Sequence, residues 1–175
     1  MTDQPRYLGL LRSIANAESD AHLYLSAWRD TTTDPEVKAV LTTVAAREGE
    51  HGMAFAKRVV ELGFDFERCE SPRLAEDLEV ARSDRSDREK AEHFRLDRIE
   101  EILSFFDDVF KDHTIDIRTG ELLGRYIAEE HDTGRLAGGC YAALCQHAAP
   151  KAAPAKRAAR PRPRPSRAKA AAASS

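Results

Sequence analysis

Long apolar runs, a basic leader and paired cysteines are all missing from this 175-residue sequence. No apolar run approaches the ~20 residues that a membrane-spanning helix needs, so we expect no membrane association. Residues 1–7 lack a basic patch followed by an apolar stretch, which argues against a secretory signal. Cys69, Cys140 and Cys145 are odd in number and show no Cys-x-x-Cys spacing, which disfavours a disulfide framework. We therefore predict a cytoplasmic protein with reduced thiols.

Aromatic residues are also scarce, at 7%, and no stretch alternates apolar and polar residues for long. Such alternation is the usual signal of a half-buried β-strand, so its absence favours an all-helical domain. Hydrophobic residues make up 42% of the chain and charged residues 33%, which suits one soluble domain with an ordinary core.

The net charge of -3 hides an uneven distribution of charge along the chain. Eight of the 27 Lys and Arg residues lie in residues 151–175, which contain no acid; the other 19 stand against 30 acids, a net charge of -11 for residues 1–150. Alternating prolines in this basic tail exclude a helix there. We predict a helical domain over residues 1–147 and a disordered Ala/Pro/Lys/Arg-rich tail over residues 148–175. The tail either binds nucleic acid or another polyanion nonspecifically, or it has a solubilising or self-associating role.

Apolar residues recur at helical spacing in four segments, which predicts helices over about 5–29, 35–62, 87–111 and 118–146. Asp34 is a suitable N-cap, Pro35 suits the first helical position, and Gly63 suits the end of the second helix. The connection over 64–86 lacks this periodicity apart from a short helix around 74–80. Two hairpins joined by a long crossover form an all-α, ferritin-like four-helix bundle.

Polar residues interrupt the apolar face of three of these helices. Glu18 interrupts the first, Glu48 and His51 the second, and Glu130 the fourth. Glu18 and Glu48 are thirty residues apart and have their midpoint in the first predicted turn, so an antiparallel hairpin places them at the same height. Glu100 and Glu130 are also thirty apart, with their midpoint in the second predicted turn. We predict that these five side chains converge near the centre of the bundle.

Buried carboxylates are costly unless a partner charge is supplied. Two divalent cations ~3.5–4 Å apart need bridging carboxylates together with terminal carboxylate or imidazole ligands. Four carboxylates would balance the four positive charges of such a pair, so the predicted set suits a dinuclear metal site. The alternative is a hydrogen-bonded polar cluster in a bundle that binds no metal.

Over residues 5–146 the sequence resembles the rubrerythrin-like branch of the ferritin-like superfamily. The motifs that carry the resemblance are Glu18, Glu48-Gly49-Glu50-His51 and Glu129-Glu130-His131. The resemblance implies a di-iron site that reduces peroxide or oxidises ferrous iron. Manganese and zinc are alternatives to iron. It further implies that Glu18 and Glu100 are carboxylate ligands and that Glu48 and Glu130 are bridging carboxylates. His51 would be the terminal imidazole. Ferritin-like bundles often dimerise, so a homodimer is a further expectation.

The sequence departs from the family pattern in its second half. The second Glu-x-x-His motif would need a glutamate at 128, where Ala128 stands. Glu130 and His131 lie about 100° apart around a helix, so only one of them points straight inward, and both remain candidate ligands. Glu101 and Glu92 remain alternatives to the carboxylate at position 100. Two hypotheses therefore stand: a di-iron oxidoreductase, or a metal-free helical bundle whose tail tethers it to nucleic acid.

Overall fold

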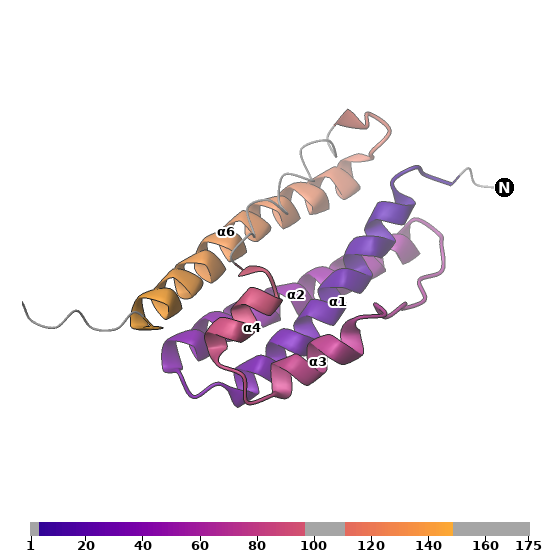
Figure 1. Cartoon of the computed structure of the whole chain (residues 1–175). Helices are drawn as coiled ribbons and strands as arrows, with labels where there is room; N and C mark the ends of the chain where they lie inside the picture. The colour runs from indigo at the N-terminus through magenta and orange to yellow at the C-terminus, as the bar shows by residue number, and fades with distance from the viewer. Residues whose placement is uncertain (1–3, 97–110, 149–175) are drawn as a thin grey trace, which may run out of the picture.

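The computed structural model describes residues 4–96 and 111–148 (Figure 1). These residues form five helices, α1 (Leu8–Thr31), α2 (Pro35–Glu61), α3 (Leu74–Arg82), α4 (Asp87–His93) and α6 (Ile117–Ala148). All regular structure in the described ranges is helical, which confirms the all-α prediction. Among these helices none is long and apolar enough to cross a membrane. Residues 149–175, to which we assigned a disordered tail, lie outside the described ranges.

The helices α1 and α2 form an antiparallel hairpin whose ends are set by the residues that the sequence indicated (Figure 1). The Asp34 carboxylate accepts hydrogen bonds from the backbone N–H groups of Glu36 and Val37, and Pro35 occupies the first turn of α2. Gly63 follows the other end of α2 with a φ of 86°, in the left-handed region that glycine adopts without strain.

The connection after α2 returns along α1 and is fixed to it at both ends. The buried Asp20 carboxylate accepts hydrogen bonds from the Arg68 guanidinium at 2.7 Å and from the Ser71 backbone N–H at 2.8 Å. Further along, the Thr31 hydroxyl donates to the Ala81 carbonyl at 3.0 Å. The predicted short helix therefore exists as α3, and the connection crosses the length of the hairpin as expected.

The third predicted helix, over about 87–111, is wrong as one continuous element. The helix α4 stops before Phe94, and Arg95 takes a φ of 58°, which a right-handed helix does not contain. The Phe94 ring stacks on Tyr24 with centroids 4.5 Å apart and packs 5.8 Å from Trp28. Packing against these aromatic rings outweighs the local helical pattern at this point.

The last helix, α6, runs antiparallel to α2, because its residue numbers rise as those of its α2 partners fall. Asp116, just before α6, pairs with Arg58 at 2.8 Å. Asp132, sixteen residues later, pairs with Arg47 at 2.6 Å. The antiparallel course places the middle of α6 beside the middle of the α1–α2 hairpin (Figure 1).

Two apolar clusters divide the core between the two ends of the hairpin. One contains Tyr7, Leu8, Leu11, Ile14, Ala15, Phe55, Val59, Leu123 and Tyr126. The other contains Leu25, Trp28, Val37, Leu41, Val44, Ala45, Ala81 and Ala91. The residue numbers leave a gap at the middle of α1 and α2, where the polar residues predicted to converge are found.

Candidate metal centre

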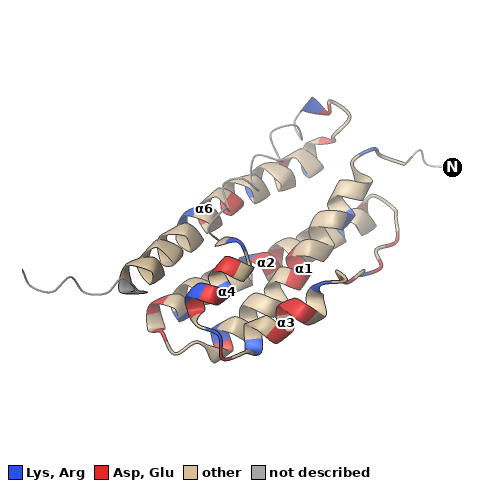
Figure 2. Ribbon diagram, in the orientation of Figure 1, with Lys and Arg blue, Asp and Glu red and all other residues tan. Residues whose placement is uncertain are grey.

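Acidic residues occur on all five helices (Figure 2), but few of their side chains are buried. Glu18 and Glu48 are 7% and 5% exposed, and the side chain of Glu130 is 13% exposed. His51, at 4%, lies among them. One potential ligand atom from each of these four residues lies within 4.8 Å of the others. The α1–α2 hairpin argued from the sequence therefore brings Glu18, Glu48 and His51 together, and α6 adds Glu130. The second predicted hairpin, which paired positions 100 and 130, lies in part outside the described residues.

Two glycines in α2 allow α1 to approach closely enough to form this cluster. A Cβ atom on Gly49 would lie 2.8 Å from Nδ1 of His22, and one on Gly52 would lie 2.6 Å from Oγ of Ser19. At Gly52 backbone atoms of α1 are also close, Ser19 N at 3.1 Å and Ala15 O at 3.3 Å, so a larger residue there would push the helices apart. A larger residue at Gly49 would displace the His22 ring. Glycine is required here for close approach rather than for a special backbone conformation.

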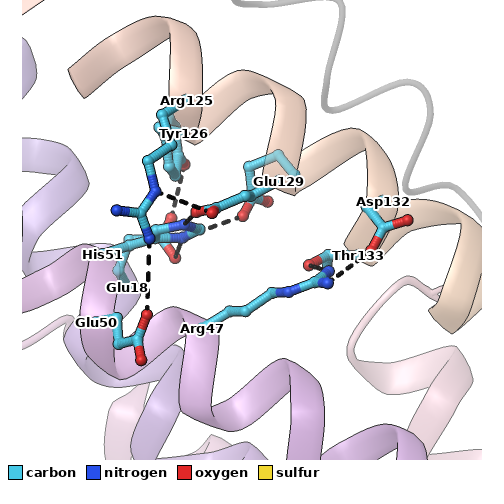
Figure 3. A network of polar contacts seen from close by, with 10 residues as sticks. Glu18, Arg47, Glu50, His51, Arg125, Tyr126, Glu129, Asp132 and Thr133 are labelled. Atoms are coloured by element: carbon cyan, nitrogen blue, oxygen red, sulfur yellow. Dashed lines mark hydrogen bonds and ion pairs between the residues drawn. The ribbon is translucent and has the colours of Figure 1, made fainter. Parts of the chain in front are cut away.

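The His51 ring is oriented by a carboxylate from α6 (Figure 3). Its Nε2 lies 2.7 Å from Oε2 of Glu129. The other oxygen of Glu129, Oε1, accepts a hydrogen bond from Nε of Arg125 at 2.9 Å. When the ring is neutral and Nε2–H donates to Glu129, an unprotonated Nδ1 faces the cluster. This Nδ1 is 3.4 Å from Oε1 of Glu130 and 3.9 Å from Oε2 of Glu18. A histidine that binds a metal through one nitrogen normally has its other ring N–H fixed in this way.

Tyr126 orients the carboxylate of Glu18 in a similar manner. Its hydroxyl donates to Oε1 of Glu18 at 2.7 Å, which leaves Oε2 directed toward the cluster. The Tyr126 ring packs edge-on against His51 and Phe55, with centroids 4.9 and 5.1 Å apart. The ring and the hydroxyl together fix two of the four converging side chains.

Three converging atoms of the cluster lack a hydrogen-bond partner among the described residues. They are Oε2 of Glu18, Nδ1 of His51 and Oε1 of Glu130, and all three are buried. Leaving one such buried atom unsatisfied costs about 1–3 kcal/mol, so three facing one another form an unfavourable arrangement. Ligands of a tetrahedral cation with bonds of about 2.1 Å are about 3.4 Å apart. The 3.4 Å between Nδ1 of His51 and Oε1 of Glu130 matches this separation. The donor set and its unsatisfied atoms therefore fit a cation.

The carboxylates and the imidazole perturb one another's proton affinity. Burial raises the pKa of Glu48 well above its usual value, and the adjacent Glu18 and Glu130 raise it further. Burial lowers the pKa of His51, but the carboxylates Glu130, Glu18 and Glu129 outweigh it and raise that pKa to about 10. Without a cation, the cluster holds protons on Glu48 and His51 to offset its negative charge. A cation would displace these protons.

Burial would raise the pKa of Glu18, but the protonated Glu48, the His51 ring and the Tyr126 hydroxyl all favour its charged form and together lower that pKa. Glu18 is therefore the carboxylate that stays ionised, with Glu48 as its protonated neighbour. Two carboxylates with opposite shifts are expected where like charges are packed together and cannot both ionise.

The remaining predicted ligands have different outcomes. His131 is exposed, so Glu130 is the member of that pair which faces the cluster. Glu92 is also exposed and pairs with Arg88 at 2.9 Å, away from the cluster. Glu100, together with its alternative at position 101, lies outside the described residues.

Sequence reasoning missed the role of Glu129 as the partner of His51. Its only local signal is Arg125 four residues earlier, and such pairs are common on exposed helix faces. The requirement that a ligating histidine has both nitrogens engaged could have prompted a search for it.

Comparison of the chain with protein-family models, with curated proteins and with solved structures finds no match. The resemblance to the ferritin-like superfamily therefore rests on the motif residues alone.

Proposed function

We propose that this protein is a ferritin-like metalloprotein that binds a divalent cation between Glu18, Glu48, His51 and Glu130. The observation that carries the proposal is the set of three buried atoms, Oε2 of Glu18, Nδ1 of His51 and Oε1 of Glu130, which face one another without hydrogen-bond partners. A cation between them would satisfy all three and would offset two of the three carboxylate charges.

The donor set favours a particular group of metals. Three carboxylates and one imidazole are oxygen-rich donors of the kind that bind iron, manganese or zinc. We propose iron, which when bound would supply the one-electron chemistry needed to reduce peroxide or to oxidise further ferrous iron. The four described ligands suffice for one cation. A second iron would need further donors, for which Glu100 was predicted and which the described residues do not supply.

The surrounding residues would act on the cation only by placing its ligands. Glu129 holds His51 so that Nδ1 faces inward, and Tyr126 holds Glu18 so that Oε2 faces inward. Phe55, which is fully buried, packs edge-on against the Tyr126 ring and so supports the group that holds Glu18. These contacts fix ligand direction before a cation arrives, which reduces the cost of ordering the site on binding.

Metal counting tests this proposal directly. Protein loaded anaerobically with ferrous iron, and separately with manganese or zinc, is desalted and its metal content is measured by elemental analysis. We expect at least one tightly held ion per chain in the wild type, a loss of at least tenfold in affinity in Glu48→Gln, and full retention in Glu50→Gln. Glu50 is the matched control because it lies two residues away on the exposed face of α2.

Equal, negligible metal content in the wild type and in Glu48→Gln would overturn the proposal. If iron is bound, an absorption change on adding peroxide that the Glu48→Gln variant lacks would support the oxidoreductase role. Bound zinc with no iron would instead favour a structural cation.

A second candidate function is supported by the charge of the C-terminal tail. Residues 151–175 carry eight Lys or Arg and no acid, whereas residues 1–150 carry a net charge of -11. We propose that the tail binds nucleic acid through its phosphates, with little sequence preference and a steep dependence on salt. Gel shifts with the full chain and with a chain ending at residue 147 test this, and equal shifts from both would rule it out.

A further inference from the structure

A cavity of about 590 Å³ adjoins the candidate metal centre between α1, α2 and α6. Glu18, Glu48 and Glu130 line it, whereas His51 does not, so the cavity meets the cluster on its carboxylate side. Most other lining side chains are apolar and include Leu10, Ile14, Leu25, Val44, Phe94 and Leu96. Ser13 and Ala17 also line it and are solvent-exposed, so the cavity opens to solvent along α1.

The size and chemistry of this cavity restrict what it can hold. Its volume falls within the roughly 300–1,000 Å³ of typical small-molecule sites, which are likewise mostly apolar with a few converging polar groups. The three carboxylates at one end would repel an anion, because one cation neutralises only two of their charges. A cationic group would compete with the metal for the same three carboxylates, and the apolar walls give no partner to a strongly polar molecule. An uncharged, largely apolar molecule is therefore the class of ligand that the cavity fits.

We propose that this cavity binds a small uncharged apolar organic molecule next to the cation. The inference rests on the proposed function only for the presence of the cation, because the apolar walls belong to the protein whether or not metal is bound. The molecule would lie against the carboxylate ligands, on the side away from His51 and Glu129. It would bury apolar surface of α1, α2 and α6 that otherwise contacts water.

Two fluorescent probes with the same aromatic skeleton test the proposed ligand class. N-phenyl-1-naphthylamine is uncharged, and 1-anilinonaphthalene-8-sulfonate adds one sulfonate to the same rings. We expect the uncharged probe to bind the full-length, metal-loaded protein with a saturable rise in fluorescence. We expect the sulfonate to bind at least tenfold more weakly, because it would meet Glu18, Glu48 and Glu130.

Two phenylalanine variants test whether binding occurs in this cavity. Ala17→Phe places a ring at its mouth, and Ala46→Phe places the same ring on an exposed part of α2 that does not line it. We expect Ala17→Phe to weaken binding of the uncharged probe at least tenfold and Ala46→Phe to leave it unchanged. Circular dichroism confirms that each variant is folded. Equal binding by the two variants, equal binding of the two probes, or no binding of the uncharged probe to the wild type would each overturn the inference.

Metal content measured on the same samples separates this inference from the proposed function. A wild-type protein that holds its cation but ignores the uncharged probe refutes the cavity inference alone. A protein that binds the uncharged probe selectively but holds no cation supports the cavity as a binding site and refutes the metal proposal alone.

Discussion

Two polar networks join the same three helices, and they differ in whether their charges are satisfied. The first, at the end of α2, is centred on Arg58. Its guanidinium donates to Thr119 at 2.9 Å, to Glu61 at 3.0 Å and to Asp116 at 2.8 Å. Tyr7 donates to the same Asp116 carboxylate at 2.8 Å. Lys57 adds a second cation, 3.6 Å from Glu61. In this network, called here the end network, two cations face two carboxylates and each charged group has a partner within the protein.

The second network is the central cluster of Glu18, Glu48, His51 and Glu130, which has more carboxylates than cations. Three of its atoms face one another without partners. The end network needs nothing from outside, so its role is to fix the register of α1, α2 and α6. The metal-free central cluster offsets its charge by holding protons on Glu48 and His51, and it still leaves three buried atoms without hydrogen bonds. Such a cost to stability is expected where function requires it. The contrast separates a structural ion pair from a candidate site within one small fold.

The largest effect should come from breaking the end network. Arg58→Met removes the cation that Asp116 and Thr119 share, and we expect it to lower the free energy of unfolding by about 2–3 kcal/mol. The Asp116 side chain is 39% exposed, so water can solvate its carboxylate once Arg58 is gone. The loss of stability is therefore smaller than for a fully buried ion pair. Urea unfolding of metal-free protein measures this. Lys57→Met is the control, since Lys57 also pairs with Glu61 but is 77% exposed; a similar loss in both variants would contradict the argument.

In the central cluster we expect a substitution to increase the stability of the metal-free protein. In metal-free protein we expect Glu48→Gln to raise the free energy of unfolding by about 1 kcal/mol, because the amide donates to the acidic neighbours without the cost of keeping a buried carboxyl protonated at neutral pH. The same urea titration measures it, with Glu50→Gln expected to have no effect. Addition of cation should stabilise the wild type and not the Glu48→Gln variant. Destabilisation of the metal-free protein by Glu48→Gln would show that the cluster is already satisfied.

A matched pair of tyrosines sharpens the comparison further. Tyr7 donates to Asp116 in the end network, and Tyr126 donates to Glu18 in the central cluster. We expect Tyr7→Phe and Tyr126→Phe each to cost about 1 kcal/mol of stability, the usual value of one such hydrogen bond. Only Tyr126→Phe should also weaken cation binding, by roughly tenfold, as loss of a group that orients a ligand does. Cation titrations on both variants check this, and equal affinities would remove the positioning role of Tyr126.

The smallest effect concerns the acid stability of the end network. Burial would raise the pKa of Asp116, but hydrogen bonds from Thr119, Tyr7 and Arg58 outweigh it and lower that pKa. The stabilisation from Asp116 is therefore present above the unfolded carboxyl pKa of about 3.9 and is lost as the pH falls below that value. We expect Asp116→Asn to unfold with a shallower dependence on pH between about 5 and 2 than the wild type. An unchanged slope would show that other carboxylates account for acid unfolding.

Local sequence patterns determined α1, α2 and much of the candidate site. Asp34 caps the start of α2 and Gly63 follows its end. Both were predictable because capping and left-handed backbone are properties of single residues. Helical periodicity identified which positions of α1 and α2 face inward, and Glu18 and Glu48 occupy such positions. A short turn forces an antiparallel hairpin, so their equal distance from it was sufficient to predict that they meet.

The tertiary structure alone decided how α6 is oriented and where α4 ends. Glu130 rather than His131 faces the cluster because the rotation of α6 is set by packing against α1 and α2, and neighbouring residues on a helix differ by only about 100°. Glu129 became the partner of His51 through a contact 78 residues away in sequence. Helix α4 ends before Phe94 because the Phe94 ring stacks on Tyr24. Periodicity is a local property, whereas these three outcomes depend on which surfaces meet in space.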